Sequence, residues 1–280
     1  MRRFLIGAAW LLIAVLSVRA QSLDELSGRF SIRSNGEQVV FSRGNLCLAI
    51  ENSTWYFATN QYDIIGEANI FGGALSTPID LFGYSGSTYY NWGVSPVNAN
   101  SLFSGDFIDW GENAIGQSPA GYWRTLTTYE WDYLLNQRDN ASQLRGVATV
   151  SGQKGLVLLP DVATVALQDS YSAAEWAQLE QEGAVFLPFA GRRIRANRVD
   201  SIGTRGYYWT ATPFAGDYVG LVNLGQSSIS MDQSDRFYGH SVRLIHSIGI
   251  QRDSVYAITI GQDCSFSNPV NTKADACTLT

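Results

Sequence analysis

Two segments of this chain carry a complete signal for the start of a helix. Thr127 and Glu130 form a capping box, because the Thr oxygen can accept from a free helix N–H while the Glu side chain reaches back to the cap. Ser172 and Glu175 repeat this pattern. Apolar residues at helical spacing follow each box, and Gly183 is the expected stop of the second helix. The chain is therefore expected to hold two main helices.

Short strands are expected before, between and after these helices. Apolar runs bounded by turn residues predict them at 30–32, 39–41, 54–58, 146–150, 155–159, 184–188, 207–212, 218–224, 227–231 and 241–245. Ser151 and Gly152 predict a hairpin turn between two of these strands. The order of strands, loops, helix, hairpin, helix and a final run of strands predicts an α+β domain with segregated elements.

The segment 66–121 is rich in Gly, Ser, Asn and aromatic residues and has little periodicity. So long an irregular stretch is uncommon in a compact domain. We expect ordered loops here, held against the core by aromatic side chains. The candidates are Tyr89, Tyr90, Trp92 and Trp110.

The first twenty residues have the parts of a secretory signal peptide. Arg2 and Arg3 give a basic start, an apolar run fills residues 4–16, and small residues predict cleavage between Ala20 and Gln21. The apolar run is too short to span the roughly 30 Å of bilayer hydrocarbon, and no later stretch is long and apolar enough to do so. We therefore expect a protein that is secreted or held at the cell surface, with no transmembrane segment.

The charge balance argues against a nucleic-acid partner. The chain has a net charge of −6, which becomes −9 when the three arginines of the leader are removed. An acidic surface repels a phosphate backbone, so nucleic acid is not expected as a main partner.

The sequence supplies few residues for metal or thiol chemistry. Cys264 and Cys277 could close a short disulfide loop in an exported protein, worth roughly 3 kcal/mol. Cys47 stands in an apolar run and is expected to be a packed strand residue. His240 and His246 are the only histidines, so a His/Cys metal site or a Cys–His catalytic pair is poorly supplied. We predict no metal, no cofactor and no catalytic residue.

Seven segments, taken in order along the chain, resemble segments of a known family. They are 40–46 (VFSRGNL), 79–84 (IDLFGY), 123–134 (WRTLTTYEWDYL), 155–161 (GLVLLPD), 183–192 (GAVFLPFAGR), 208–212 (YWTAT) and 239–245 (GHSVRLI). Residues 30–247 thereby resemble the major paralogous domain first described in Fibrobacter and abundant in Bacteroidetes surface proteins. The resemblance implies a C-type-lectin-like fold of the formylglycine-generating-enzyme type. The expected domains are the leader 1–20, this domain at 21–247, and a β tail at 248–280 that resembles the start of a further module.

The same resemblance bears on enzymatic activity. Formylglycine-generating enzymes hold copper with a pair of cysteines late in the domain, and this chain has no cysteine between Leu48 and Asp263. C-type lectins that bind sugar through calcium carry a Glu-Pro-Asn or Gln-Pro-Asp turn and a Trp-Asn-Asp run, and neither occurs here. We therefore predict a protein that is not an enzyme and that does not chelate sugar through calcium.

A binding face is the remaining candidate for a site. Alternation in the strands 218–224 and 227–231 predicts a set of small polar residues on the outward side, flanked by aromatic residues. Tyr combined with Ser, Asn and Asp is typical of adaptable recognition surfaces. An ordinary solvated sheet edge would have the same pattern. The predicted ligand-binding residues are Tyr207, Phe214, Asp217, Tyr218, Leu221, Asn223, Ser228, Ser230, Asp232 and Tyr238.

The arginines at 192, 193, 195, 198 and 205 form the one basic run. They could meet an anionic ligand, although paired or exposed surface arginines are the ordinary case. Together these predictions favour an exported, non-enzymatic, adhesin- or lectin-like domain that recognises an extracellular protein or glycan. Two alternatives stay open: an extracellular enzyme with an unrecognised site, and a spacer module of a larger cell-surface protein.

Overall fold

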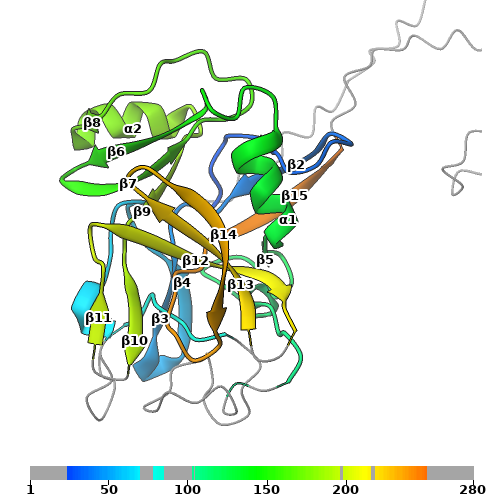
Figure 1. The fold of residues 1–280 in the computed structure, drawn as a ribbon, viewed down its shortest axis with the longest axis vertical. Helices are drawn as coiled ribbons and strands as arrows, with labels where there is room; N and C mark the ends of the chain where they lie inside the picture. Colours follow the sequence, from blue (N-terminus) through cyan, green and yellow to red (C-terminus); the bar gives the residue numbers. More distant parts are fainter. Residues whose placement is uncertain are drawn as a thin grey trace, which may run out of the picture. The chain divides into compact units, whose positions relative to one another are not determined.

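The computed structural model describes residues 24–69, 78–84, 103, 105–195, 198–215 and 218–250. These residues form a mixed α and β fold, in which several small sheets carry most of the regular structure and two short α-helices pack beside them (Figure 1). Among them, no helix is both long enough and apolar enough to cross a bilayer. The leader 1–20, the tail 251–280, Asp217, Cys264 and Cys277 lie outside the described residues.

The first helix begins where the sequence predicts. α1 (Thr128–Asp132) has its capping box: Glu130 N donates to Thr127 Oγ1 at 3.2 Å, and Thr127 N donates to Glu130 Oε2 at 2.9 Å. The chain continues as one π-helical turn, Tyr133–Gln137. The apolar stripe of this segment enters the core through Trp131, Leu134 and Leu135.

The second helix also follows its capping box. α2 (Ala173–Gln181) starts where Glu175 N donates to Ser172 Oγ at 3.3 Å and Ser172 N donates to Glu175 Oε2 at 2.7 Å. Gly183 follows with a φ of +91°, in the left-handed region that Gly adopts at little cost. Trp176 fixes the helix to the neighbouring sheet, because its indole is buried in a cluster of apolar side chains there.

The predicted hairpin lies between the two helices. β6 (Arg145–Val150) and β7 (Gln153–Leu158) pair antiparallel around Ser151 and Gly152, whose φ angles are 49° and 85°. Positive φ at both central residues matches the twist of a two-residue hairpin turn, which is why this dipeptide predicts it. Two further strands complete the sheet in the order β8-β6-β7-β9, namely β8 (Ser170–Tyr171) and β9 (Val185–Pro188).

Another sheet joins the first and last described strands. Its order is β1-β2-β15-β5, formed by β1 (Phe30–Ser31), β2 (Glu37–Phe41), β15 (Leu244–Ile250) and β5 (Arg124–Thr125). The sequence predicts the last strand at 241–245, and it begins later because Ser241 is bridged to Tyr208 instead. The strand runs to Ile250, beyond the domain boundary expected at 247.

A three-stranded antiparallel sheet occupies the middle of the fold. Its strands, in spatial order, are β12 (Arg205–Pro213), β13 (Tyr218–Gly225) and β14 (Ile229–Asp235). Two hairpins accompany it, one of β10 (Arg192–Arg195) and β11 (Arg198–Asp200), the other of β3 (Leu46–Ala49) and β4 (Thr54–Phe57).

This central sheet has a hydrophobic core on each face. Tyr208 and Val222, which pair across β12 and β13, belong to one cluster with Trp131. Trp209 and Leu221, the next pair, belong to the second cluster. Successive side chains of a strand point to opposite faces, so the two clusters lie on opposite sides of the sheet. The middle of β12 and β13 therefore has no solvent face.

Buried contacts hold the described parts of the irregular segment 66–121. Arg236 Nη1 donates to the carbonyl oxygen of Phe103 at 2.9 Å, and its guanidinium lies 5.6 Å from the centre of the Tyr84 ring. Trp110 is buried in the second core cluster, as expected for an aromatic residue that anchors a loop. The other predicted anchors, Tyr89, Tyr90 and Trp92, lie outside the described residues.

Candidate functional site

A hydrogen-bonded polar cluster lies at one end of the central sheet, formed by Arg205, Asn223, Ser230 and Asp232. Asp232 Oδ2 accepts from Asn223 Nδ2 at 2.8 Å and from Ser230 Oγ at 3.0 Å. Arg205 Nη1 donates to Asn223 Oδ1 at 3.2 Å. The strand register brings these side chains together, because Asn223 is paired with Ser230. All four side chains are partly exposed, so the cluster is ordered and reachable from solvent.

Beside this polar cluster lies an arginine stack, formed by Arg192, Tyr207 and Tyr238. The guanidinium carbon of Arg192 is 4.9 Å from the ring centre of Tyr207 and 5.5 Å from that of Tyr238. A bridge between Gly191 and Gly206 brings β10 against β12 and sets Arg192 next to Tyr207. Stacking on an aromatic ring holds a planar guanidinium in one orientation.

The two groups share one face of the sheet. Tyr207 pairs with Asn223 across β12 and β13, and residues paired in this way have Cβ atoms about 5 Å apart. The surface therefore offers a cation, amide and hydroxyl donors, a carboxylate acceptor and the partly exposed ring of Tyr238. This is the chemistry of recognition by hydrogen bonds and ring contacts.

Two of the predicted ligand-binding residues are not on the surface. Tyr207 is 7% exposed and Leu221 is 3% exposed, and both belong to the second core cluster. The prediction that this strand face is outward is wrong for them. The physical reason is the second core, which covers the face on which Leu221 lies. Only the end of that face, from Asn223 and Asp232 outward, reaches solvent.

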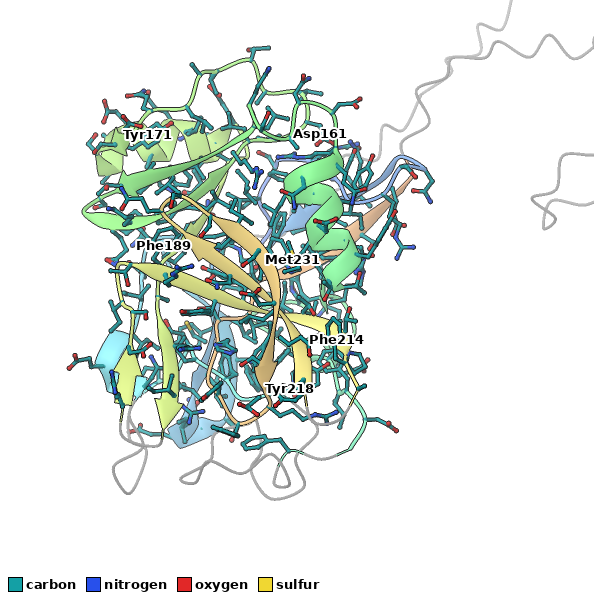
Figure 2. The ribbon with its side chains drawn as sticks, in the orientation of Figure 1. Asp161, Tyr171, Phe189, Phe214, Tyr218 and Met231 are labelled. Carbon is teal, nitrogen blue, oxygen red and sulfur yellow. The ribbon has the colours of Figure 1, made fainter. Side chains whose placement is uncertain are left out.

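Phe214 and Tyr218 lie on the opposite face of the sheet. Successive side chains of a strand point to opposite faces, so Tyr218 lies on the same face of β13 as Gly220 and on the opposite face from Asn223. A Cβ built at Gly220 would lie 3.1 Å from Phe214 Cε2 and 2.3 Å from Thr128 Oγ1 of α1. Figure 2 shows Phe214 and Tyr218 close together, and both side chains are exposed. The expectation of one surface holding these rings and the polar cluster is therefore wrong.

The remaining predicted residues are placed as follows. Ser228 is exposed in the turn between β13 and β14, where its carbonyl oxygen accepts from Gly225 N at 2.8 Å. Tyr238 lies in the loop after β14 and joins the arginine stack. Asp217 lies outside the described residues.

The basic run does not form a uniform surface. Arg193 is buried, and burial lowers the pKa of its guanidinium to about 10, so it stays charged at neutral pH. Arg198 is largely exposed, Arg205 belongs to the polar cluster, and Arg192 belongs to the arginine stack. The expectation of exposed arginines is wrong for Arg193, which lies against Gly239 in the bridge between β10 and the chain after β14.

A buried Ser–His contact, absent from the predicted site residues, lies close to this face. Ser234 Oγ lies 2.7 Å from His240 Nε2, and both residues are buried. Burial lowers the pKa of His240 well below its usual value, and the positive charges of Arg192 and Arg193 lower it further. Within the described residues, His240 Nδ1 has no hydrogen-bond partner, so no carboxylate orients the ring as in a hydrolytic triad. The spacing of Ser234 and His240 on a strand and the loop that follows it was the available signal.

Metal and thiol chemistry find little support in the described part of the chain. No group of three or more His, Cys, Asp or Glu side chains is arranged there to hold a metal ion. Cys47 is buried in β3, as expected for a packed strand residue, and burial raises the pKa of its thiol. A hollow of about 150 Å³ lies between the 159–165 loop and α2, lined mainly by apolar residues such as Pro160, Val165 and Leu179, and it is separate from the polar cluster.

Comparison with protein-family models, with curated proteins and with solved structures finds no match to this chain.

Proposed function

We propose that this protein is an exported, non-enzymatic domain with a C-type-lectin-like fold, which recognises an extracellular protein or glycan. Its contact surface is the polar cluster together with the arginine stack. The predicted leader at 1–20 supports export to the cell surface or the medium. The order of strands, helix, hairpin, helix and strands supports the coarser part of this fold, an α+β domain, because it is the order predicted from the sequence patterns.

The observation that carries this proposal is the arrangement of Asn223 and Asp232. Their side chains are held by each other and by Ser230 and Arg205, while all four remain partly exposed. Binding groups that are already ordered lose little entropy when a ligand arrives, which favours recognition. The neighbouring ring of Tyr238 adds contact area with few rotatable bonds.

The buried polar groups favour binding over catalysis. The Ser234–His240 pair is enclosed by the rings of Tyr207 and Trp209, which lie 5.6 Å and 4.3 Å from the imidazole centre. A nucleophile and base must reach the substrate, and these two do not reach the surface. The sequence also lacks the late cysteine pair that formylglycine-generating enzymes require.

The proposal is tested by screening the purified protein on an array of glycans and bacterial and host surface proteins. We expect binding to a subset of ligands, and we expect the double variant Asn223→Ala/Asp232→Ala to lose it while unfolding at a similar temperature. Unchanged binding by the folded double variant would move the site elsewhere. Turnover of any array ligand would favour an enzyme.

A further inference from the structure

Arg192 is held in place without using its hydrogen-bonding edge. Its guanidinium carbon lies over the rings of Tyr207 and Tyr238, at 4.9 Å and 5.5 Å from their centres. Its single ion pair among the described residues joins Nε to Asp200 Oδ1 at 3.5 Å, and this contact lacks the geometry of a hydrogen bond. In the same part of the chain, no acceptor engages either Nη group. The side chain is 31% exposed, so those groups can be reached from outside.

We propose that Arg192 binds the carboxylate of an acidic saccharide, an inference that rests on the proposed recognition function and names its ligand class. A guanidinium offers two parallel N–H groups that match the two oxygens of a carboxylate. The arginine stack keeps the guanidinium of Arg192 in one orientation before the ligand arrives, which lowers the entropic cost of binding. The contact with Asp200 is made at Nε, so it leaves the two Nη groups of Arg192 free to bind a carboxylate.

The neighbouring polar cluster favours a saccharide over an acidic peptide. Asp232 Oδ2 already accepts two hydrogen bonds, whereas Oδ1 has no partner among the described residues. This oxygen can accept from a donor such as a sugar hydroxyl, and it repels a second carboxylate. An acidic sugar carries several hydroxyl donors and one carboxylate on the same ring, which suits Arg192 and Asp232 together.

The chain offers a matched control for the charge of Arg192. Arg198 lies on the partner strand of the same hairpin, near the same carboxylate, with Nη2 4.0 Å from Asp200 Oδ2. Its side chain is 63% exposed, and among the described residues it takes part in no ring stack. Removing the charge of Arg198 thus tests the long-range attraction of an anionic ligand while leaving the guanidinium of Arg192 in place.

The experiment is an NMR titration of the isotopically labelled protein with methyl glucuronide and, separately, with methyl glucoside. We expect methyl glucuronide to shift the guanidinium signals of Arg192 with an affinity in the millimolar range, and methyl glucoside to bind about tenfold more weakly. Arg192→Gln is expected to weaken glucuronide binding about tenfold, and Arg192→Lys to restore only part of it because the two parallel N–H groups are lost. Arg198→Gln is expected to change the affinity less than about twofold. Thermal unfolding of each variant checks that it is folded.

Equal binding of glucuronide and glucoside would overturn the proposal, as would equal losses in Arg192→Gln and Arg198→Gln. Tighter Arg192-dependent binding of a polyglutamate peptide than of glucuronide would replace the saccharide with an acidic peptide. If array binding depends on Asn223 and Asp232 while glucuronide binding ignores Arg192, this inference fails and the proposed function stands. If array binding is also independent of Asn223 and Asp232, the proposed site fails as well.

Discussion

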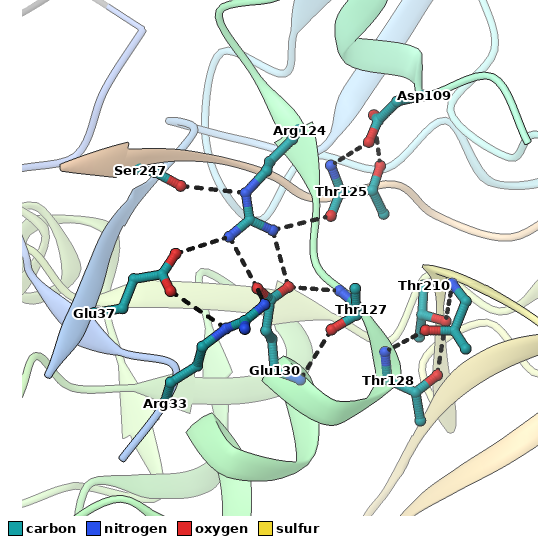
Figure 3. A network of polar contacts seen from close by, with 11 residues as sticks. Arg33, Glu37, Asp109, Arg124, Thr125, Thr127, Thr128, Glu130, Thr210 and Ser247 are labelled. Atoms are coloured by element: carbon teal, nitrogen blue, oxygen red, sulfur yellow. Dashed lines mark hydrogen bonds and ion pairs between the residues drawn. The ribbon is translucent and has the colours of Figure 1, made fainter. Parts of the chain in front are cut away.

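Arg124 and Glu130 form a bidentate ion pair. Arg124 Nη1 donates to Glu130 Oε2 at 2.9 Å and Nη2 donates to Oε1 at 3.0 Å, while Glu130 is 1% exposed (Figure 3). Arg33 adds a third hydrogen bond to Oε1 at 2.9 Å. The carboxylate of α1 is thereby joined to β5 and to the turn between β1 and β2. One buried charge, satisfied from both sides, ties the helix to two other elements.

Glu130→Gln is expected to lower the free energy of unfolding by about 2 kcal/mol, because the neutral amide cannot satisfy both arginines. The measurement is urea unfolding followed by circular dichroism. Glu175→Gln is the matched control, since Glu175 occupies the same capping-box position in the exposed α2. A loss in Glu175→Gln as large as that in Glu130→Gln would mean that capping, and not the ion-pair network, accounts for the effect.

The stability of the protein is expected to fall in acid through Glu130. Burial by itself would raise the pKa of this carboxyl, but hydrogen bonds from Arg124, from Thr127 N and from Arg33 outweigh it and lower the pKa to about 2. Since this pKa is below the unfolded value of 4.5, the contribution is present above pH 4.5 and is lost as the pH falls toward 2. The difference in unfolding free energy between wild type and Glu130→Gln should shrink across this range. A difference that is constant with pH would contradict the account.

Gly220→Ala is expected to destabilise the protein by about 3 kcal/mol, because the new methyl group would overpack the contact between α1 and β13. A Cβ there would lie 2.3 Å from Thr128 Oγ1 and 2.5 Å from Thr210 Oγ1. Gly203→Ala is the control: its φ is +72° and no atom lies within 4 Å of the added Cβ, so only backbone strain of about 1 kcal/mol is expected. Thermal unfolding of both variants compares them. Similar losses would argue against tight packing at Gly220.

Export is expected to remove the leader. When the full chain is expressed in a bacterium with a secretory pathway, N-terminal sequencing of the product outside the cytoplasm should begin at Gln21. The physical reason is the short apolar run followed by small residues before the cleavage point. Recovery of the protein in the cytoplasm with Met1 or Arg2 at its N-terminus would contradict the proposed location.

The local features of the fold could be predicted from the sequence, and the solvent side of the central sheet could not. Thr127, Ser172 and the Ser151–Gly152 turn act through neighbouring residues, so their patterns identify both helices and the hairpin. Alternation along the strand places Leu221 and Val222 on opposite faces of the sheet, but it does not say which face is covered by other parts of the chain. Here both faces are covered, which requires knowledge of distant segments.

The candidate site was predictable only in part for the same reason. Asn223, Ser230 and Asp232 share one face by strand alternation alone, and the structure joins them by hydrogen bonds. The contact of Arg192 with Tyr238 joins positions far apart in the sequence, and the burial of Arg193 depends on the pairing of β10 with the chain at Gly239. Neither the Arg192–Tyr238 contact nor the burial of Arg193 can be predicted from neighbouring residues in the sequence.

The most direct test of the account compares the two faces of the central sheet. Surface plasmon resonance would measure the affinity of the strongest array ligand for wild type, for Asn223→Ala/Asp232→Ala and for Phe214→Ala/Tyr218→Ala. We expect a loss of about tenfold or more in the first double variant and a change of less than about twofold in the second. A loss confined to Phe214→Ala/Tyr218→Ala would contradict it and move the recognition surface to the face beside α1.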